Sequence, residues 1–136
     1  MAQDDVIGSL NDLVWSGEFR SVPFYEPETD MLHLYIADEE DWGDVVDGRL
    51  TLFRSFQTNA VTGFSLRGIR RRLLPIVGTF GLEQGQGHVT VGMLLLAAVI
   101  AAADEGDRCK LSGREYLEAV APICQAAGKM RVDIPA

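Results

Sequence analysis

The clearest alternation of hydrophobic and polar side chains runs through residues 31–37. In an extended chain, Leu32, Leu34 and Ile36 point to one face of this segment and His33 points to the other. A period of two residues is typical of a half-buried strand. We therefore predict a β-strand here, with the leucines in the core and His33 on the opposite face.

Two more segments alternate in the same way, at residues 49–56 and 61–69. The turn between them contains Asn59, a residue type that suits tight turns. Short connections favour antiparallel pairing of successive strands. The pattern therefore predicts a three-stranded antiparallel β-meander within about residues 22–74.

The C-terminal third of the chain has the pattern of a helix pair. An almost uninterrupted apolar segment follows Thr90, which suits a helix N-cap, and runs to about Asp104. Ser112 and Glu115 have the spacing of a capping box and predict a second helix, which should end near Ala127. A helix that is apolar on nearly every side must be buried in a core or at an interface.

The remaining segments complete a single α+β domain over residues 1–136. Residues 3–15 place apolar side chains at helical spacing and predict a short N-terminal helix. We expect Pro75 to end the segment after the third strand, and a glycine-rich connector at residues 76–89 to lead into the helical part at 90–128. The predicted fold is the three-stranded meander packed with an N-terminal helix and a C-terminal helix pair.

The composition favours a globular protein of the cytoplasm. The chain is 47% hydrophobic and 24% charged, so it can bury a core. The sequence begins without the basic and apolar regions of a secretory signal, and the apolar run at residues 91–103 is shorter than the about 20 residues that span a bilayer. Cys109 and Cys124 make no disulfide framework, which suits a reducing compartment. We expect a soluble, cytoplasmic protein without membrane association.

Charge is distributed unevenly along the chain. The net charge is −8, which disfavours nucleic-acid binding, yet four arginines gather at residues 67–72. An acidic segment surrounds Trp42 and could chelate Mg²⁺ or dock a basic partner, whereas the arginines could hold phosphate or RNA. We expect the two blocks to pair, within the chain or between chains. The candidate interaction residues are Asp38, Glu39, Glu40, Asp41, Trp42, Arg67, Arg70, Arg71 and Arg72.

No catalytic, cofactor or metal site is predicted. No nucleophile or carboxylate is spaced to activate His33, so we expect it to be a structural or partly exposed strand residue. His33, His88, Cys109 and Cys124 lack the spacing of zinc ligands. Residues 104–115 have the outline of a calcium loop, but a glycine and an arginine stand where oxygen ligands are needed.

Two parts of the chain resemble known families. The segment "YEPETDMLHLYI" together with "DVVDGRLTLFRSFQTNAVTGFSLRGIRRRL" resembles a small bacterial domain-of-unknown-function family, and this resemblance implies a β-meander. The segment "LLLAAVIAAADEGDRCKLSGREYLEAVAPICQAAG" is similar to the helix–loop–helix of tellurite-resistance (TerB-like) helical domains. The residues that match the first family are Tyr25, Glu26, Asp30, Leu32, Val61, Gly63, Phe64 and Leu66.

These observations predict a non-catalytic interaction or regulatory protein that acts as a homo-oligomer. A dimer would cover the apolar helix at residues 91–103, and Leu95 is an example of an interface position. The same helix could instead lie at the centre of a compact monomer. The alternative function is a small-molecule-binding protein or enzyme with its site near the glycine-rich connector at residues 78–90, beside His88.

Overall fold

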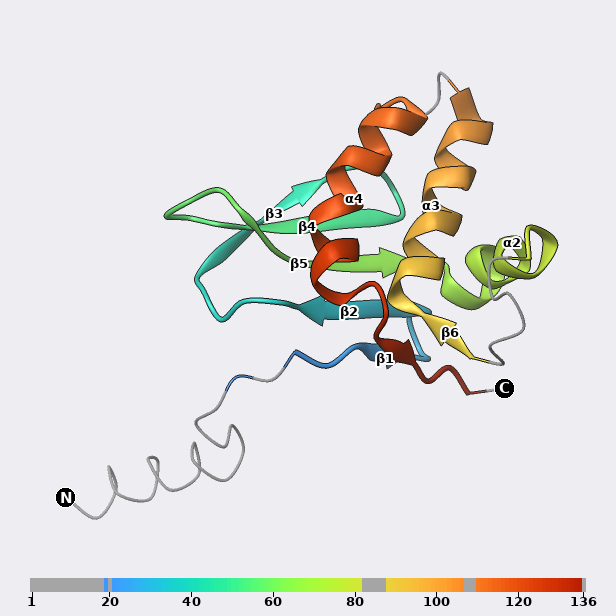
Figure 1. Ribbon diagram of the computed structural model, residues 1–136, viewed down its shortest axis with the longest axis horizontal. Helices are drawn as coiled ribbons and strands as arrows, with labels where there is room; N and C mark the ends of the chain where they lie inside the picture. Colours follow the sequence, from blue (N-terminus) through green and yellow to red (C-terminus); the bar gives the residue numbers. More distant parts are fainter. Residues whose placement is uncertain (1–18, 20, 82–87, 107–109, 136) are drawn as a thin grey trace, which may run out of the picture.

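A five-stranded antiparallel sheet forms the body of the protein (Figure 1). The computed structural model describes residues 19, 21–81, 88–106 and 110–135. The predicted N-terminal helix and part of the glycine-rich connector lie outside these residues. In chain order the elements are β1 (Phe24–Glu26), β2 (Met31–Tyr35), β3 (Asp41–Val45), β4 (Leu50–Ser55), β5 (Val61–Arg67), the π-helical turn η1 (Ile69–Leu73), α2 (Leu74–Thr79), β6 (Val89–Thr90), α3 (Val91–Glu105), α4 (Gly113–Ala127) and β7 (Arg131–Val132).

The strand order of the main sheet is β1-β2-β5-β4-β3. The three predicted strands are confirmed as β2, β4 and β5, but the three-stranded meander is wrong in its strand count and in its neighbours. β2 pairs with β5 and not with β4, because β3, β4 and β5 form successive hairpins and β5 then returns beside β2. This is a Greek-key arrangement, and it places β5 at the centre of the sheet.

Strand β3 lies in the acidic segment around Trp42, for which no strand was predicted. Its sequence, "DWGDV", contains residue types that are depleted in strands and shows no apolar alternation. It forms a strand at the edge of the sheet, where only one side has to pair, and Asp44 contacts Arg54 of β4 at 2.9 Å. Charged side chains on an edge strand also discourage further strands from adding there.

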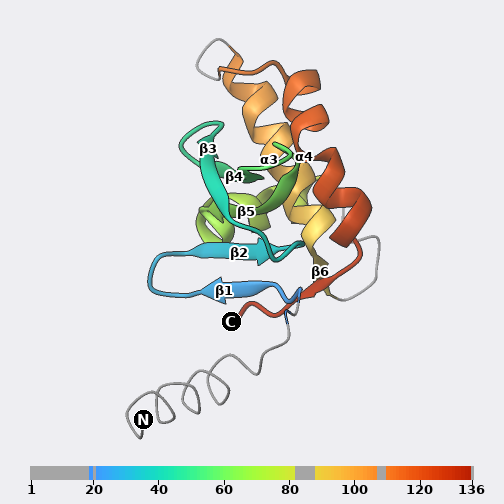
Figure 2. The same ribbon diagram turned by 90° about the vertical axis from the view of Figure 1, so that its left-hand side faces the viewer.

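The core lies between one face of the sheet and the helices. The predicted leucine face of β2 is confirmed, since Leu32 and Leu34 are 0% and 1% exposed. Figure 2 shows α3 and α4 side by side on the same side of the sheet. The helices contribute Leu94, Leu95 and Tyr116, which are also fully buried. The opposite face of the sheet has no described helix against it.

Both predicted helices of the C-terminal pair are confirmed, together with their caps. The Thr90 hydroxyl accepts a hydrogen bond from the Met93 N–H at 3.3 Å. Ser112 accepts from the Glu115 N–H, and the Glu115 carboxylate accepts from the Ser112 N–H, which completes the capping box. No helix in the described part of the chain is long and apolar enough to cross a membrane.

Helix α3 is buried mainly within its own chain. Leu95 is 0% exposed, so the choice of Leu95 as an interface position is wrong. α3 packs against α4, α2 and η1, and Leu95 belongs to the same buried cluster as the leucines of the strands. Leu96, the next residue, is 41% exposed and lies on the outer side of the helix.

Pro75 does not end the segment after β5. It lies in the first turn of α2, where a missing N–H leaves no intrahelical hydrogen bond unmade. Residues 76–79 therefore belong to a helix, and the connector begins later than predicted.

The start of α3 is held against the end of α4. The Val91 N–H donates to the Met130 carbonyl and the Gly92 N–H donates to the Gly128 carbonyl, both at 2.9 Å. A Cβ at position 92 would lie 2.9 Å from the Gly128 carbonyl oxygen, so glycine is needed for this approach. Strands β6 and β7 pair just outside this contact.

Candidate functional site

The acidic and arginine blocks lie at opposite ends of the sheet. Asp41 begins β3 opposite Ser55, near the β4–β5 turn, whereas Arg67 ends β5 at the far end of that strand. In Figure 1, β3 and α2 mark these two ends. The ion pairs of the described residues join neither block to the other, so the expected pairing within one chain is wrong. Pairing between chains stays a prediction.

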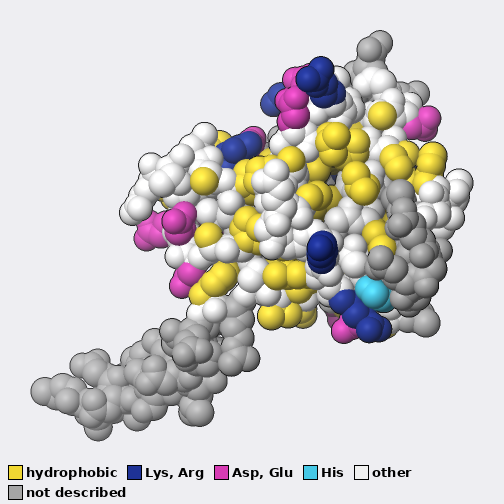
Figure 3. All heavy atoms as spheres, in the orientation of Figure 1, with side chains coloured by type: hydrophobic (Ala, Val, Ile, Leu, Met, Phe, Trp, Pro, Cys, Tyr) yellow, Lys and Arg dark blue, Asp and Glu magenta, His cyan; other side chains and the backbone are white. Residues whose placement is uncertain are grey.

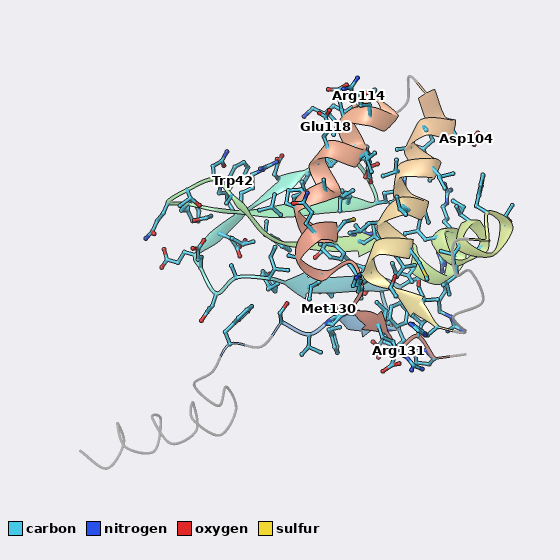
Figure 4. The ribbon with its side chains drawn as sticks, viewed as in Figure 1. Trp42, Asp104, Arg114, Glu118, Met130 and Arg131 are labelled. Atoms are coloured by element: carbon cyan, nitrogen blue, oxygen red, sulfur yellow. The ribbon has the colours of Figure 1, made fainter. Side chains whose placement is uncertain are left out.

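The acidic block presents an exposed surface around Trp42. Asp38, Glu39 and Glu40 are exposed in the connection before β3, and Trp42 is 39% exposed. Trp42 projects at the edge of the molecule away from Arg131 (Figure 4). Docking of a basic partner on this block stays a prediction.

The arginine block borders a surface hollow of about 500 Å³. The residues that line it include Tyr25, Thr29, Arg67, Arg70 and Arg71. The hollow therefore lies where β1, the β1–β2 turn and the end of β5 meet η1.

Asp30 holds this region together. Its Oδ1 accepts hydrogen bonds from the Tyr25 hydroxyl at 2.6 Å and the Arg70 N–H at 2.8 Å, and its Oδ2 accepts from the Arg71 N–H at 3.2 Å. Its carbonyl accepts from the N–H groups of Gly68 and Ile69. Asp30 has a φ of 55°, a left-handed conformation that this bonding network maintains.

Two pKa shifts follow from this bonding. Burial alone would raise the pKa of Asp30, but the hydrogen bonds from Tyr25 and from the N–H groups of Arg70 and Arg71 bring it below its ordinary value. Burial, together with the hydrogen bond to Asp30 and its charge, raises the pKa of Tyr25 to about 12. Near neutral pH the pair is therefore a carboxylate bound by a neutral phenol.

His33 has partners that the sequence did not reveal. Its Nδ1 lies 2.7 Å from the Ser65 Oγ, and its Nε2 lies 3.3 Å from a carboxylate oxygen of Glu26. The imidazole also stacks on Phe24 with ring centroids 6.4 Å apart. The prediction that no nucleophile or carboxylate is spaced to activate His33 considered neighbours along the sequence. The structure places both beside it, because β5 pairs with β2 and brings Ser65 opposite His33.

A serine, a histidine and a carboxylate in this order are also the parts of a nucleophilic triad. Here, however, Ser65 is 7% exposed and lies in the central strand, which is paired along both edges. The backbone N–H groups around it belong to the sheet, whereas acyl transfer needs such donors to face the substrate oxygen. The array is suited to joining β1, β2 and β5 on the open face of the sheet.

A second polar network joins the β3–β4 turn to the helices by hydrogen bonds. Asp47 accepts from the Arg49 guanidinium at 2.7 Å and from the Tyr116 hydroxyl at 3.3 Å, and Arg49 also contacts Glu105. Burial and the charge of Asp47 raise the pKa of Tyr116. The nearby charges of Asp47, Tyr116 and Glu105 outweigh burial and raise the pKa of Arg49. Each polar group has a partner, so this network serves the fold.

An apolar groove runs between the outer sides of α3 and α4. Its volume is about 370 Å³, and the exposed leucines Leu96 and Leu117 border it. Hydrophobic side chains gather over these two helices in Figure 3. Burial raises the pKa of the Cys124 thiol, which stays protonated and forms part of the apolar wall. The remaining lining residues are Gly92, Ala121, Gln125 and Gly128.

The described residues that line the groove carry no formal charge. Arg114 and Glu118 form an exposed ion pair at 3.4 Å on the first turns of α4, and Figure 4 shows both at the end of α4 away from Met130.

A third hollow, of about 390 Å³, lies beside His88. Leu74 and the C-terminal residues 131–135 form its other walls, and Arg131 contacts Asp133 at 3.5 Å. Among the described residues, no group of three histidine, cysteine or acidic side chains is placed to hold a metal ion. The alternative site near residues 78–90 stays a prediction, with this hollow as its place.

The family resemblances concern β1–β5 and the α3–α4 pair. They stay predictions, because neither is tested by the fold alone. Comparisons with protein-family models, with curated proteins and with solved structures found no match to this chain.

Proposed function

We propose that this is a non-catalytic interaction or regulatory protein that acts as a homodimer through the groove between α3 and α4. The observation that carries the proposal is the exposure of two leucines, Leu96 at 41% and Leu117 at 45%, beside an uncharged hollow. Large apolar side chains that gather around a hollow are typical of protein–protein contact sites.

The same groove offers what a two-fold contact requires. In such a dimer one patch meets its own copy, so it must contain both a projection and a matching depression. Leu96 and Leu117 supply the projections, and the small residues Gly92, Ala121 and Gly128 supply the depression. A second copy could place its leucines in this hollow and remove both sets from water.

Sedimentation of the full chain at tens of micromolar tests the proposal. We expect a dimer, and we expect Leu96→Glu to raise its dissociation constant more than about a hundredfold, because burial of an unpaired carboxylate costs several kcal/mol. Phe56→Glu is the matched control, since Phe56 is 66% exposed in the β4–β5 turn and away from both helices.

Two results would contradict the proposal. One is a wild-type monomer at this concentration, and the other is a Leu96→Glu protein that dimerises as well as Phe56→Glu does. Circular dichroism of each variant shows whether the fold is intact, which Leu96 permits because its side chain lies outside the core.

A further inference from the structure

The described arginines fall into two sets. Arg49, Arg54, Arg114 and Arg131 each contact a carboxylate. The four arginines at residues 67–72 are exposed, and none of them takes part in an ion pair with a described residue. In a chain with a net charge of −8, four neighbouring exposed cations that have no described carboxylate within ion-pair distance suggest an external anion.

The Asp30 carboxylate beside this cluster is already engaged. Asp30 accepts the Tyr25 hydroxyl and two backbone N–H groups, with distances from 2.6 to 3.2 Å. These bonds fix the backbone at Arg70 and Arg71, while the charge of Arg71 acts on the Asp30 carboxylate and the charge of Arg70 acts on the Tyr25 hydroxyl. The arginines thus project from a backbone that is held in one conformation.

We propose that the hollow bordered by Tyr25, Thr29, Arg67, Arg70 and Arg71 binds the phosphate group of a small phosphate monoester. Guanidinium groups match phosphate oxygens in charge and in paired hydrogen-bond geometry. The volume of about 500 Å³ is in the range of small-molecule sites. Tyr25 and Pro27 also line the hollow and are the residues that could make apolar contacts with the rest of the ligand.

The charges around the hollow favour a small ligand over a nucleic acid. Glu28 and Asp30 also line it and offset part of the arginine charge. A single phosphate can be held locally by three guanidiniums, whereas a long polyanion would also meet the acidic remainder of the chain.

Nuclear magnetic resonance titration of the full chain tests this site. The probes are adenosine monophosphate, inorganic phosphate and adenosine, which separate a monoester site from a general anion site and from a base site. We expect adenosine monophosphate to shift the amide signals of residues 67–71, inorganic phosphate to shift them at higher concentration, and adenosine to have no effect.

Paired variants make the result specific. Arg67→Gln with Arg71→Gln should weaken monoester binding by about a hundredfold, or tenfold for each lost charge-assisted hydrogen bond. Arg114→Gln is the control, because it removes one exposed positive charge on α4 and should leave binding unchanged.

Three outcomes would overturn the proposal. These are no shift at residues 67–71 with millimolar adenosine monophosphate, equal binding by the double variant and the wild type, or tighter binding of a single-stranded RNA than of the monoester. The site is separate from the α3–α4 groove, so its failure leaves the dimer proposal untouched.

Discussion

The two faces of the main sheet are built from the same strands but differ in how far their side chains are buried. On the covered face, Leu32, Leu34 and Phe64 are at most 1% exposed and pack beneath the helices. On the open face, Phe24 is 61% exposed and Tyr35 is 40% exposed. Consecutive residues of one strand can therefore differ entirely in how much apolar surface they remove from water.

The open face keeps its order by pairwise contacts. His33 contacts Ser65 and Glu26, while the rings of Tyr35 and Phe53 stack with centroids 5.1 Å apart. Gly63 lies between those rings in the strand register, and a Cβ there would come within 2.4 Å of the Leu34 carbonyl oxygen. The covered face is stabilised by burial, and the open face by hydrogen bonds and ring contacts that are individually small.

The largest expected difference is between Phe64 and Phe53. Phe64→Ala should lower the free energy of unfolding by about 3–5 kcal/mol, because it leaves a cavity in the core. Phe53→Ala should cost about 0.5–1.5 kcal/mol, since it removes mainly the ring contact with Tyr35. Equilibrium urea unfolding measures both, and equal losses would contradict the assignment of the core to one face.

A smaller effect is expected for the cap of the helix that covers the sheet. Ser112→Ala removes the acceptor for the Glu115 N–H and should cost about 0.5–2 kcal/mol. Ser112→Asp keeps an acceptor and serves as the control. An unchanged denaturation midpoint for Ser112→Ala would show that the cap contributes nothing to stability.

The smallest effect is expected at His33. His33→Gln keeps a polar side chain that can bond to Ser65, so the loss should be under about 1 kcal/mol. Thermal unfolding of this variant beside Phe64→Ala sharpens the contrast between the faces. A loss above about 2 kcal/mol would mean that the open face also depends on its central residues.

The sequence revealed the faces of the strands but not their order. Alternation at Leu32 and Leu34 depends on local geometry, and the structure confirms it. The position of β5 depends on pairing over 32 residues between His33 and Ser65, and no local pattern records it. The assumption that successive strands are neighbours put β4 beside β2, and for that reason the partner of His33 was missed.

The surfaces were predicted to different extents. The arginine block can be recognised in the sequence as four residues. The hollow beside it also needs Tyr25 of β1 and Asp30 of the β1–β2 turn, which are distant from the arginines in the sequence. Helix α3 was recognised as an element to be covered, whereas its exposed residue, Leu96, became apparent only once the sheet was seen to bury Leu95. The edge strand β3 gave no signal, because its residues resemble those of a loop.

The central position of β5 also sets an order of events during synthesis. The ribosome delivers β2 well before β5, yet β5 is the strand that must fill the place between β2 and β4. Until then, the inner edge of β2 presents backbone groups that any other extended chain could pair with. Rapid formation of the β3–β4–β5 hairpins, which need only local contacts, then allows β5 to pair with β2 soon after it has been made. The newly made chain is therefore most exposed to aggregation between the release of β2 and the arrival of β5.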